Sequence, residues 1–146
     1  MTDRMYNKVD LAREQLDVAI SLFRKKKFAS ALTLAGAAEE ILGKALSHRG
    51  QLNSLELKYE TLEPILTMRR KTKEDFIRDE NRALIAVTHM ESASEPSVTL
   101  HLEEAALSMI VRACENSDLL GLPHTARMRE FENYFYEHVV GVETPQ

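Results

Sequence analysis

The sequence is poor in cysteine, tryptophan, glycine and proline, and each shortage narrows what the chain can be. It has a single cysteine in 146 residues, so no disulfide can form within the chain, and we expect a reducing, cytoplasmic location. Tryptophan is absent and aromatic residues make up 6%, so aliphatic side chains must supply most of the core. The few glycines and prolines fall where helices could end.

Long apolar runs and an excess of basic residues are also missing. No apolar stretch reaches the roughly 20 residues that a membrane-spanning helix needs, and the first residues lack the apolar run of a signal peptide. We therefore expect no membrane contact. The net charge of −4 argues against a protein that coats nucleic acid, because binding to phosphate requires a basic surface.

What remains is a globular composition, with 44% hydrophobic and 29% charged residues. The length fits a single domain over residues 1–146, with an ordered core over about 8–140. Apolar residues recur at helical spacing and predict an all-α fold. Because the connections are short, we expect an antiparallel bundle of about five to six helices.

The predicted helices cover residues 8–24, 28–48, 57–68, 72–90 and 100–119, with a last helix capped by Thr125. Residues 28–48 are apolar nearly all round, which is typical of a central helix. Pro64 should either kink the third helix or divide it into two pieces. We expect a loop over residues 92–97 and fraying after Gly141.

The usual motifs of metal and phosphate chemistry are missing. The sequence contains no His-Glu-x-x-His, no Gly-x-Gly-x-x-Gly, and no histidine preceded by glutamate at three residues. Cys114 lies on an apolar helix face, which favours a small core residue over a nucleophile. We therefore expect no metal and no cofactor.

Two patterns suggest a site. Arg78, Arg82, Ile85 and His89 follow one another at spacings of four, three and four, so they share one helix face. Guanidinium and imidazole groups together could cleave RNA through its own 2′-hydroxyl without a metal. The alternative interpretation is a solvated face whose arginines pair with nearby aspartates.

The second pattern is a carboxylate inside the most apolar helix. Glu39 is in line with Leu32 and Leu46, seven residues away on either side, so its charge needs a partner. One hypothesis is that Glu39 orients Arg82 or His89 across the bundle. The other is a structural ion pair, or a position at the rim with the carboxylate in water.

At these two segments the sequence resembles the HEPN superfamily (higher eukaryotes and prokaryotes nucleotide-binding domain). Residues 36–46, Gly-Ala-Ala-Glu-Glu-Ile-Leu-Gly-Lys-Ala-Leu, are similar to that family's Ala-Glu-Lys-Ala-Leu-Lys signature, and Arg82 and His89 resemble its Arg, four to six residues, His motif. The resemblance extends from about Lys8 to Val139. It implies a helical bundle that often dimerises, with the two motif helices facing each other.

Active members of that family are metal-independent ribonucleases of toxin–antitoxin and phage-defence systems. The resemblance therefore implies that Arg82 binds the scissile phosphate and that His89 is the base or acid, with Glu39, Arg78 and Asn81 as binding residues. It implies as partners a second copy of the chain, RNA or a nucleotide, and an antitoxin or nucleotidyltransferase-like protein.

The chain departs from this pattern at the motif itself. Similar bacterial members read Asn-Arg-Ala-Arg-Asn-Ala-x-Lys-His, whereas residues 81–89 read Asn-Arg-Ala-Leu-Ile-Ala-Val-Thr-His. On this alignment Leu84 and Ile85 replace the motif Arg and Asn, and Arg82 is only the flanking arginine. A non-catalytic dimeric module is the favoured hypothesis; a HEPN ribonuclease and an unrelated helical adaptor are the alternatives.

Two basic runs, at residues 24–27 and 69–73, bear on possible partners. Such runs are usually solvated helix ends. If both flanked the motif face, they would form an RNA-binding rim.

Overall fold

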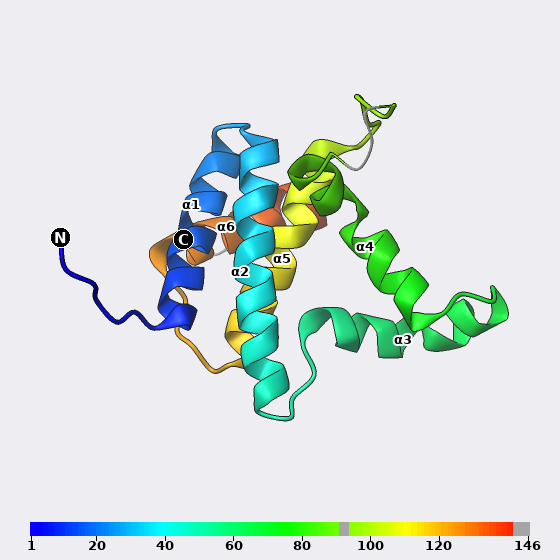
Figure 1. Ribbon diagram of the computed structural model, residues 1–146, viewed down its shortest axis with the longest axis horizontal. Coiled ribbons are helices and arrows are strands. Elements are labelled where there is room, and N and C mark those ends of the chain that lie inside the picture. The colour runs from blue at the N-terminus through cyan, green and yellow to red at the C-terminus, as the bar shows by residue number, and fades with distance from the viewer. Residues whose placement is uncertain (91–93, 142–146) are drawn as a thin grey trace.

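The computed structural model describes residues 1–90 and 94–141. Within these residues the chain forms six α-helices and no strand (Figure 1). The helices are α1 (Lys8–Arg24), α2 (Phe28–His48), α3 (Ser54–Met68), α4 (Lys73–Thr88), α5 (Leu102–Leu119) and α6 (Ala126–Phe135), followed by a π-helical turn, η1 (Tyr136–Val140). The predicted all-α bundle of five to six helices is confirmed.

Helix ends agree with the predictions where a capping residue marks them. α1 and α2 have the predicted bounds, and the side chains of Thr72 and Thr125 cap α4 and α6 as expected. α3 begins earlier than predicted, because Asn53 and Glu56 form a capping box, and it continues past Pro64 without dividing. α4 ends at Thr88, before the predicted Met90, so His89 lies just outside the helix with an extended backbone.

Two predictions involve residues outside the described part of the chain. The loop expected over residues 92–97 includes 92 and 93, which the structure does not describe. The fraying expected after Gly141 falls entirely on residues 142–146, which are likewise not described.

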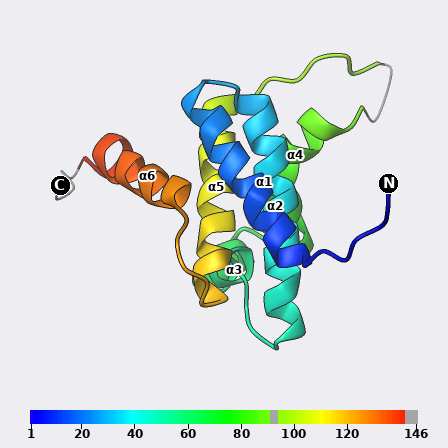
Figure 2. The same cartoon turned by 90° about the vertical axis from the view of Figure 1, so that its left-hand side faces the viewer.

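Three helices make the centre of the bundle, with α2 between α1 and α5 (Figures 1 and 2). α1 and α2 are antiparallel as expected, but α5 runs in the same direction as α2, so the bundle is not antiparallel throughout. Glu39 contacts Arg112, and Arg49, directly after α2, donates to the carbonyl of Leu120 (3.3 Å). The long connection through α3 and α4 returns the chain to the end where α2 began. The core consists mainly of aliphatic and small side chains from these helices, together with Phe23 of α1, and is closed at one side by Met128 and Phe131 of α6.

α3 and α4 extend away from this centre as an arm (Figure 1). Phe76 of α4 is buried and packs against Tyr59 of α3, with ring centroids 5.7 Å apart, which holds the two helices together. We call this pair the α3–α4 arm. The turn that joins its helices, residues 69–72, lies at its far end (Figure 1).

Four helices end in the same left-handed turn. After α1, α2, α3 and α5, two backbone N–H groups bond back to the carbonyls of the last helical turn in a Schellman pattern. Gly50 and Gly121 occupy the position of positive φ in two of these turns, but Lys26 (φ 61°) and Arg70 (φ 57°) occupy it in the others. A residue with a Cβ is strained in that conformation, so a glycine at either position should stabilise the turn.

None of the helices described is long and apolar enough to cross a membrane.

Candidate functional site

Glu39 has a partner inside the bundle, and the partner is Arg112 of α5. The Arg112 Nη2 and Glu39 Oε1 atoms are 3.1 Å apart, and the two side chains are only 9% and 11% exposed. The hypothesis that Glu39 orients Arg82 or His89 is therefore wrong. The alternative hypothesis of a structural ion pair is confirmed.

Arg112 joins three helices at this point. Its Nη1 donates to the Asn81 side-chain oxygen (2.9 Å) and to the Glu80 carbonyl (3.4 Å), both on α4, while Nη2 faces Glu39 on α2. The buried Nε and Nη2 atoms make no hydrogen bond among the described residues. Two of the predicted binding residues, Glu39 and Asn81, are thus brought together through an arginine that the sequence analysis did not single out.

Asn116, one turn further along α5, completes the buried polar contacts. Its side-chain N–H donates to the Glu39 carbonyl (3.2 Å), and its oxygen accepts from the Ser54 N–H (2.8 Å) at the start of α3. Asn116 is fully buried. Because a buried amide needs its hydrogen bonds satisfied, Asn116 fixes where the arm begins relative to α2 and α5.

α4 turns an apolar face toward α2. A Cβ built on Gly36 would lie 2.5 Å from Leu84 Cδ1, so the leucine packs directly on the backbone of α2. Leu84 stands where the resemblance would place the motif arginine. At about 100° per residue, Arg82 lies on the far side of α4 from Leu84.

The remaining predicted site residues are exposed: Arg78 and Arg82 lie on that outer face of α4, and His89 follows the end of the helix. Arg78 forms an ion pair with Asp75, His89 Nδ1 lies 2.7 Å from the Thr88 hydroxyl, and Arg82 has no hydrogen bond or ion pair within the described part of the chain. Hydrogen bonding to Thr72, together with the Arg78 charge, lowers the pKa of Asp75. Arg78 and Arg82 therefore point away from the side of α4 that faces Glu39, and His89 lies beyond the end of the helix.

A cavity of about 360 Å³ separates α2 from the arm near the buried ion pair. It combines amide, carboxylate and ammonium groups over an apolar base, and its polar lining includes Glu39, Asn53, Asn81, Arg112, Lys44 and Lys73. This lining can hydrogen-bond a polar ligand. It offers no imidazole or thiol for catalysis.

The described residues provide neither a reactive thiol nor a cluster of metal ligands. Burial, followed by the charges of Asp118, Asp17 and Glu132, raises the pKa of the Cys114 thiol to about 12, so the thiolate that a nucleophile needs is not formed near neutral pH. Within the residues described, no three histidine, cysteine, aspartate or glutamate side chains converge on a point that could hold a metal ion.

The two basic runs do not form one rim. Residues 24–27 lie at the turn between α1 and α2, and residues 69–73 lie at the far end of the arm (Figure 1). Lys71 and Lys73 are also paired, with Asp79 (3.1 Å) and Glu56 (3.9 Å).

The sequence carried a signal for the two residues that were missed. Arg112 and Asn116 are four apart and lie on the side of the fifth helix that also carries Met109 and Ala113. Polar residues in an apolar stripe require a buried partner, as at Glu39.

No family model, no curated protein and no solved structure matches this chain significantly.

Proposed function

We propose that the chain is a non-catalytic, HEPN-like interaction module that acts as a homodimer. The observation that carries this proposal is the packing of Leu84 on Gly36. The position that faces α2 from α4 holds a side chain that can neither bind phosphate nor move a proton. The carboxylate that could have organised a catalytic group is already paired with Arg112.

The proposed dimer surface is the outer groove between α1 and α2. A cavity of about 520 Å³ follows it, with an apolar floor made by Val9, Ala37, Ile41 and Ala45. Glu40 and Lys44 lie one turn apart on its rim. In an antiparallel two-fold pairing of α2 with its copy, each Glu40 comes opposite the Lys44 of the second copy, which makes the surface complementary to itself.

Light scattering with size-exclusion chromatography tests the dimer. Wild type is expected at twice the 16.6 kDa chain mass, and Ile41→Lys at the chain mass, with the helix content of both retained by circular dichroism. Glu40→Lys, which places two ammonium groups opposite each other, should also weaken the dimer, and the double variant Glu40→Lys/Lys44→Glu should restore it. A monomeric wild type at the concentrations assayed would contradict the proposal.

A metal-independent ribonuclease is the second candidate, favoured by the exposure of Arg82 on the outer face of α4 and of His89 directly after the helix. The assay is cleavage of single-stranded and structured RNA in the presence of EDTA. We expect none from wild type. Turnover that disappears in Arg82→Ala and His89→Ala, but survives in Arg78→Ala, would replace our proposal with the catalytic one.

Recognition of RNA or a nucleotide without cleavage would use the same outer face of α4 or the cavity beside Glu39. Titration of a fluorescent oligonucleotide and of a mononucleotide distinguishes the two, because Arg82→Ala should weaken only oligonucleotide binding, and Lys73→Ala, at the cavity but outside the proposed dimer surface, only mononucleotide binding. The absence of binding to both would leave a protein partner as the ligand of the module.

A further inference from the structure

The outer side of α5 forms the floor of an apolar groove that the function proposed above does not use. Leu107, Val111 and Cys114 follow one another there at spacings of four and three. One cavity, of about 480 Å³, lies between this stripe and α3, and a second, of about 220 Å³, lies between it and α6. The two cavities share Val111, Glu115 and Phe135 in their linings and therefore adjoin, and together we call them the α5 groove.

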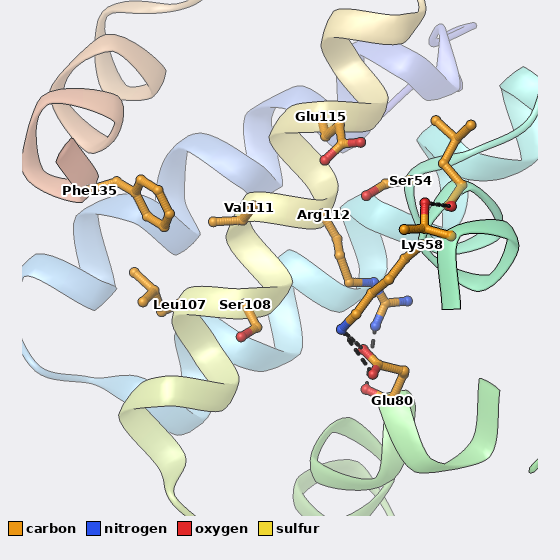
Figure 3. Close-up of a pocket in the computed structure, with 11 residues that line it drawn as sticks. Ser54, Lys58, Glu80, Leu107, Ser108, Val111, Arg112, Glu115 and Phe135 are labelled. Carbon is orange, nitrogen blue, oxygen red and sulfur yellow. Dashed lines mark hydrogen bonds and ion pairs between the residues drawn. The ribbon is translucent and has the colours of Figure 1, made fainter. Parts of the chain in front are cut away.

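The walls of the α5 groove are helices on both sides. Figure 3 shows Leu107, Ser108, Val111 and Glu115 leaving the same side of α5, with Phe135 approaching Val111 from α6. Leu57 and Thr61 of α3 line the opposite wall. The far wall of the second cavity is aromatic, because Phe131 and Phe135 of α6 and Tyr136 of η1 line it.

The charges that remain available in the groove are negative. Glu115, Asp118 and Glu132 line it, and all three are exposed. The carboxylate of Glu80 holds the Lys58 ammonium with both of its oxygens (2.8 and 2.9 Å; Figure 3), and Arg112 is occupied by Glu39. His124 lies between Asp118 (2.5 Å) and Glu132 (3.4 Å), so it can offset at most one of the three negative charges.

The pKa of the Cys114 thiol reflects the same negative charges. Its pKa is raised first by burial and then by the charges of Asp118, Asp17 and Glu132, two of which line the groove. A cationic group that enters beside these carboxylates would meet favourable charge. The aromatic rings next to them add a cation–π surface.

We propose that the α5 groove binds a basic amphipathic helix of a partner protein. The apolar side of the partner helix lies over Leu107 and Val111, and a lysine or arginine reaches Glu115, Asp118 and Glu132 beside the α6 rings. A helix fits because the groove runs along α5 between two helical walls. Such a groove accommodates apolar side chains that the partner helix carries at positions i, i+4 and i+7. Nucleic acid does not fit, since carboxylates at the rim repel phosphate.

The test uses a pair of model peptides, each about four helical turns long. One has leucines at i, i+4 and i+7 flanked by lysines, and the other has glutamates in place of the lysines. Binding to the full chain is measured by fluorescence anisotropy at physiological salt, where screening removes weak non-specific attraction. We expect a Kd of about 10 µM for the lysine peptide and at least about tenfold weaker binding of the glutamate peptide.

Matched variants locate the binding site. Glu115→Lys should weaken binding of the lysine peptide at least about fivefold, whereas Glu103→Lys, the same charge change on α5 outside the groove, should leave it unchanged. Val111→Lys should abolish binding, and Val18→Lys, on an exposed part of α1, should not. Ile41→Lys tests the proposed dimer separately, because it should leave peptide binding intact.

Three outcomes would overturn the proposal. Equal affinity for the two peptides would show that charge does not select the partner. Equal loss in Glu115→Lys and Glu103→Lys would show that only net charge matters. A change from dimer to monomer in Val111→Lys would show that a second copy of this chain occupies the groove.

Discussion

Arg112 of α5 reaches across the bundle to Glu39 of α2, and its Nη2 lies 3.1 Å from the carboxylate with both side chains nearly excluded from water. Arg112 is also bonded to Asn81 of α4 (2.9 Å). One guanidinium therefore connects the centre of the bundle to the arm. Because either charge is costly to bury alone, the pair makes the stability of the fold depend on both residues together.

Removing one member of the Glu39–Arg112 ion pair should strongly destabilise the fold. Glu39→Gln leaves the Arg112 charge buried without its counter-ion, and we expect the free energy of unfolding to fall by about 3–5 kcal/mol in urea titrations. Glu103→Gln, at an exposed position of α5 outside both proposed interfaces, is the control and should change little. A double variant, Glu39→Leu/Arg112→Met, should recover much of the loss; if it is less stable than either single variant, the ion pair is not what the site requires.

Because Gly36 contacts Leu84, whether Gly36→Ala stabilises or destabilises the fold should depend on the residue at position 84. Gly36→Ala improves helix propensity by about 1 kcal/mol, but its Cβ would lie 2.5 Å from Leu84 Cδ1 and 3.1 Å from Leu84 Cγ. We expect a net loss of about 1 kcal/mol in otherwise wild-type protein, because Leu84 has to move. In Leu84→Ala the same substitution should stabilise the fold, and equal effects in the two backgrounds would refute the contact.

Lys26 offers a stabilising substitution. Its φ of 61° is strained for any residue with a Cβ, so Lys26→Gly should raise the free energy of unfolding by about 1 kcal/mol. Lys25→Gly, one residue earlier at φ −90°, should have the opposite effect, because there glycine only adds freedom to the unfolded chain. Thermal unfolding of the two variants, which have the same composition, measures the difference directly.

Cys114 should make stability fall in alkaline solution. The folded thiol has its pKa raised to about 12, against a usual value of 9.0, so above pH 9 the unfolded chain loses a proton that the folded chain keeps. The resulting loss, up to about 1.4 kcal/mol per pH unit between pH 9 and pH 12, should be absent in Cys114→Ala. Comparing urea unfolding of the two proteins at pH 8 and pH 10 isolates it, and parallel curves would contradict the burial.

Much of the fold follows from local pattern. The bounds of α1 and α2 could be predicted because charged residues end each apolar repeat, and capping threonines marked α4 and α6. Pro64 was ambiguous, since a proline inside a helix removes one backbone hydrogen bond and can either kink the helix or divide it, and the local sequence does not decide between these outcomes. The direction of α5 was not predictable, because it depends on where residues 49–101 return the chain.

The candidate site was predictable only in part. Burial of a charge at Glu39 requires a partner, but its identity depended on a contact between helices far apart in sequence. The outward direction of Arg82 could have been inferred, since Ile77 and Leu84 lie seven apart on the opposite, apolar side of the same helix. The predicted shared face holds for Arg78 and Arg82 but not for His89, because α4 ends at Thr88. The direction in which that face points follows from the packing of Leu84 against Gly36.

The shared direction of α2 and α5 also governs how the chain reaches this structure. α1 and α2 meet through a turn of three residues, so their pairing is local and should form early. Asn116 and Glu39 are 77 positions apart, and their contact forms only after the whole intervening segment has been gathered. The α1–α2 hairpin is therefore the expected folding nucleus. The packing of α5 against this hairpin is the expected slow step.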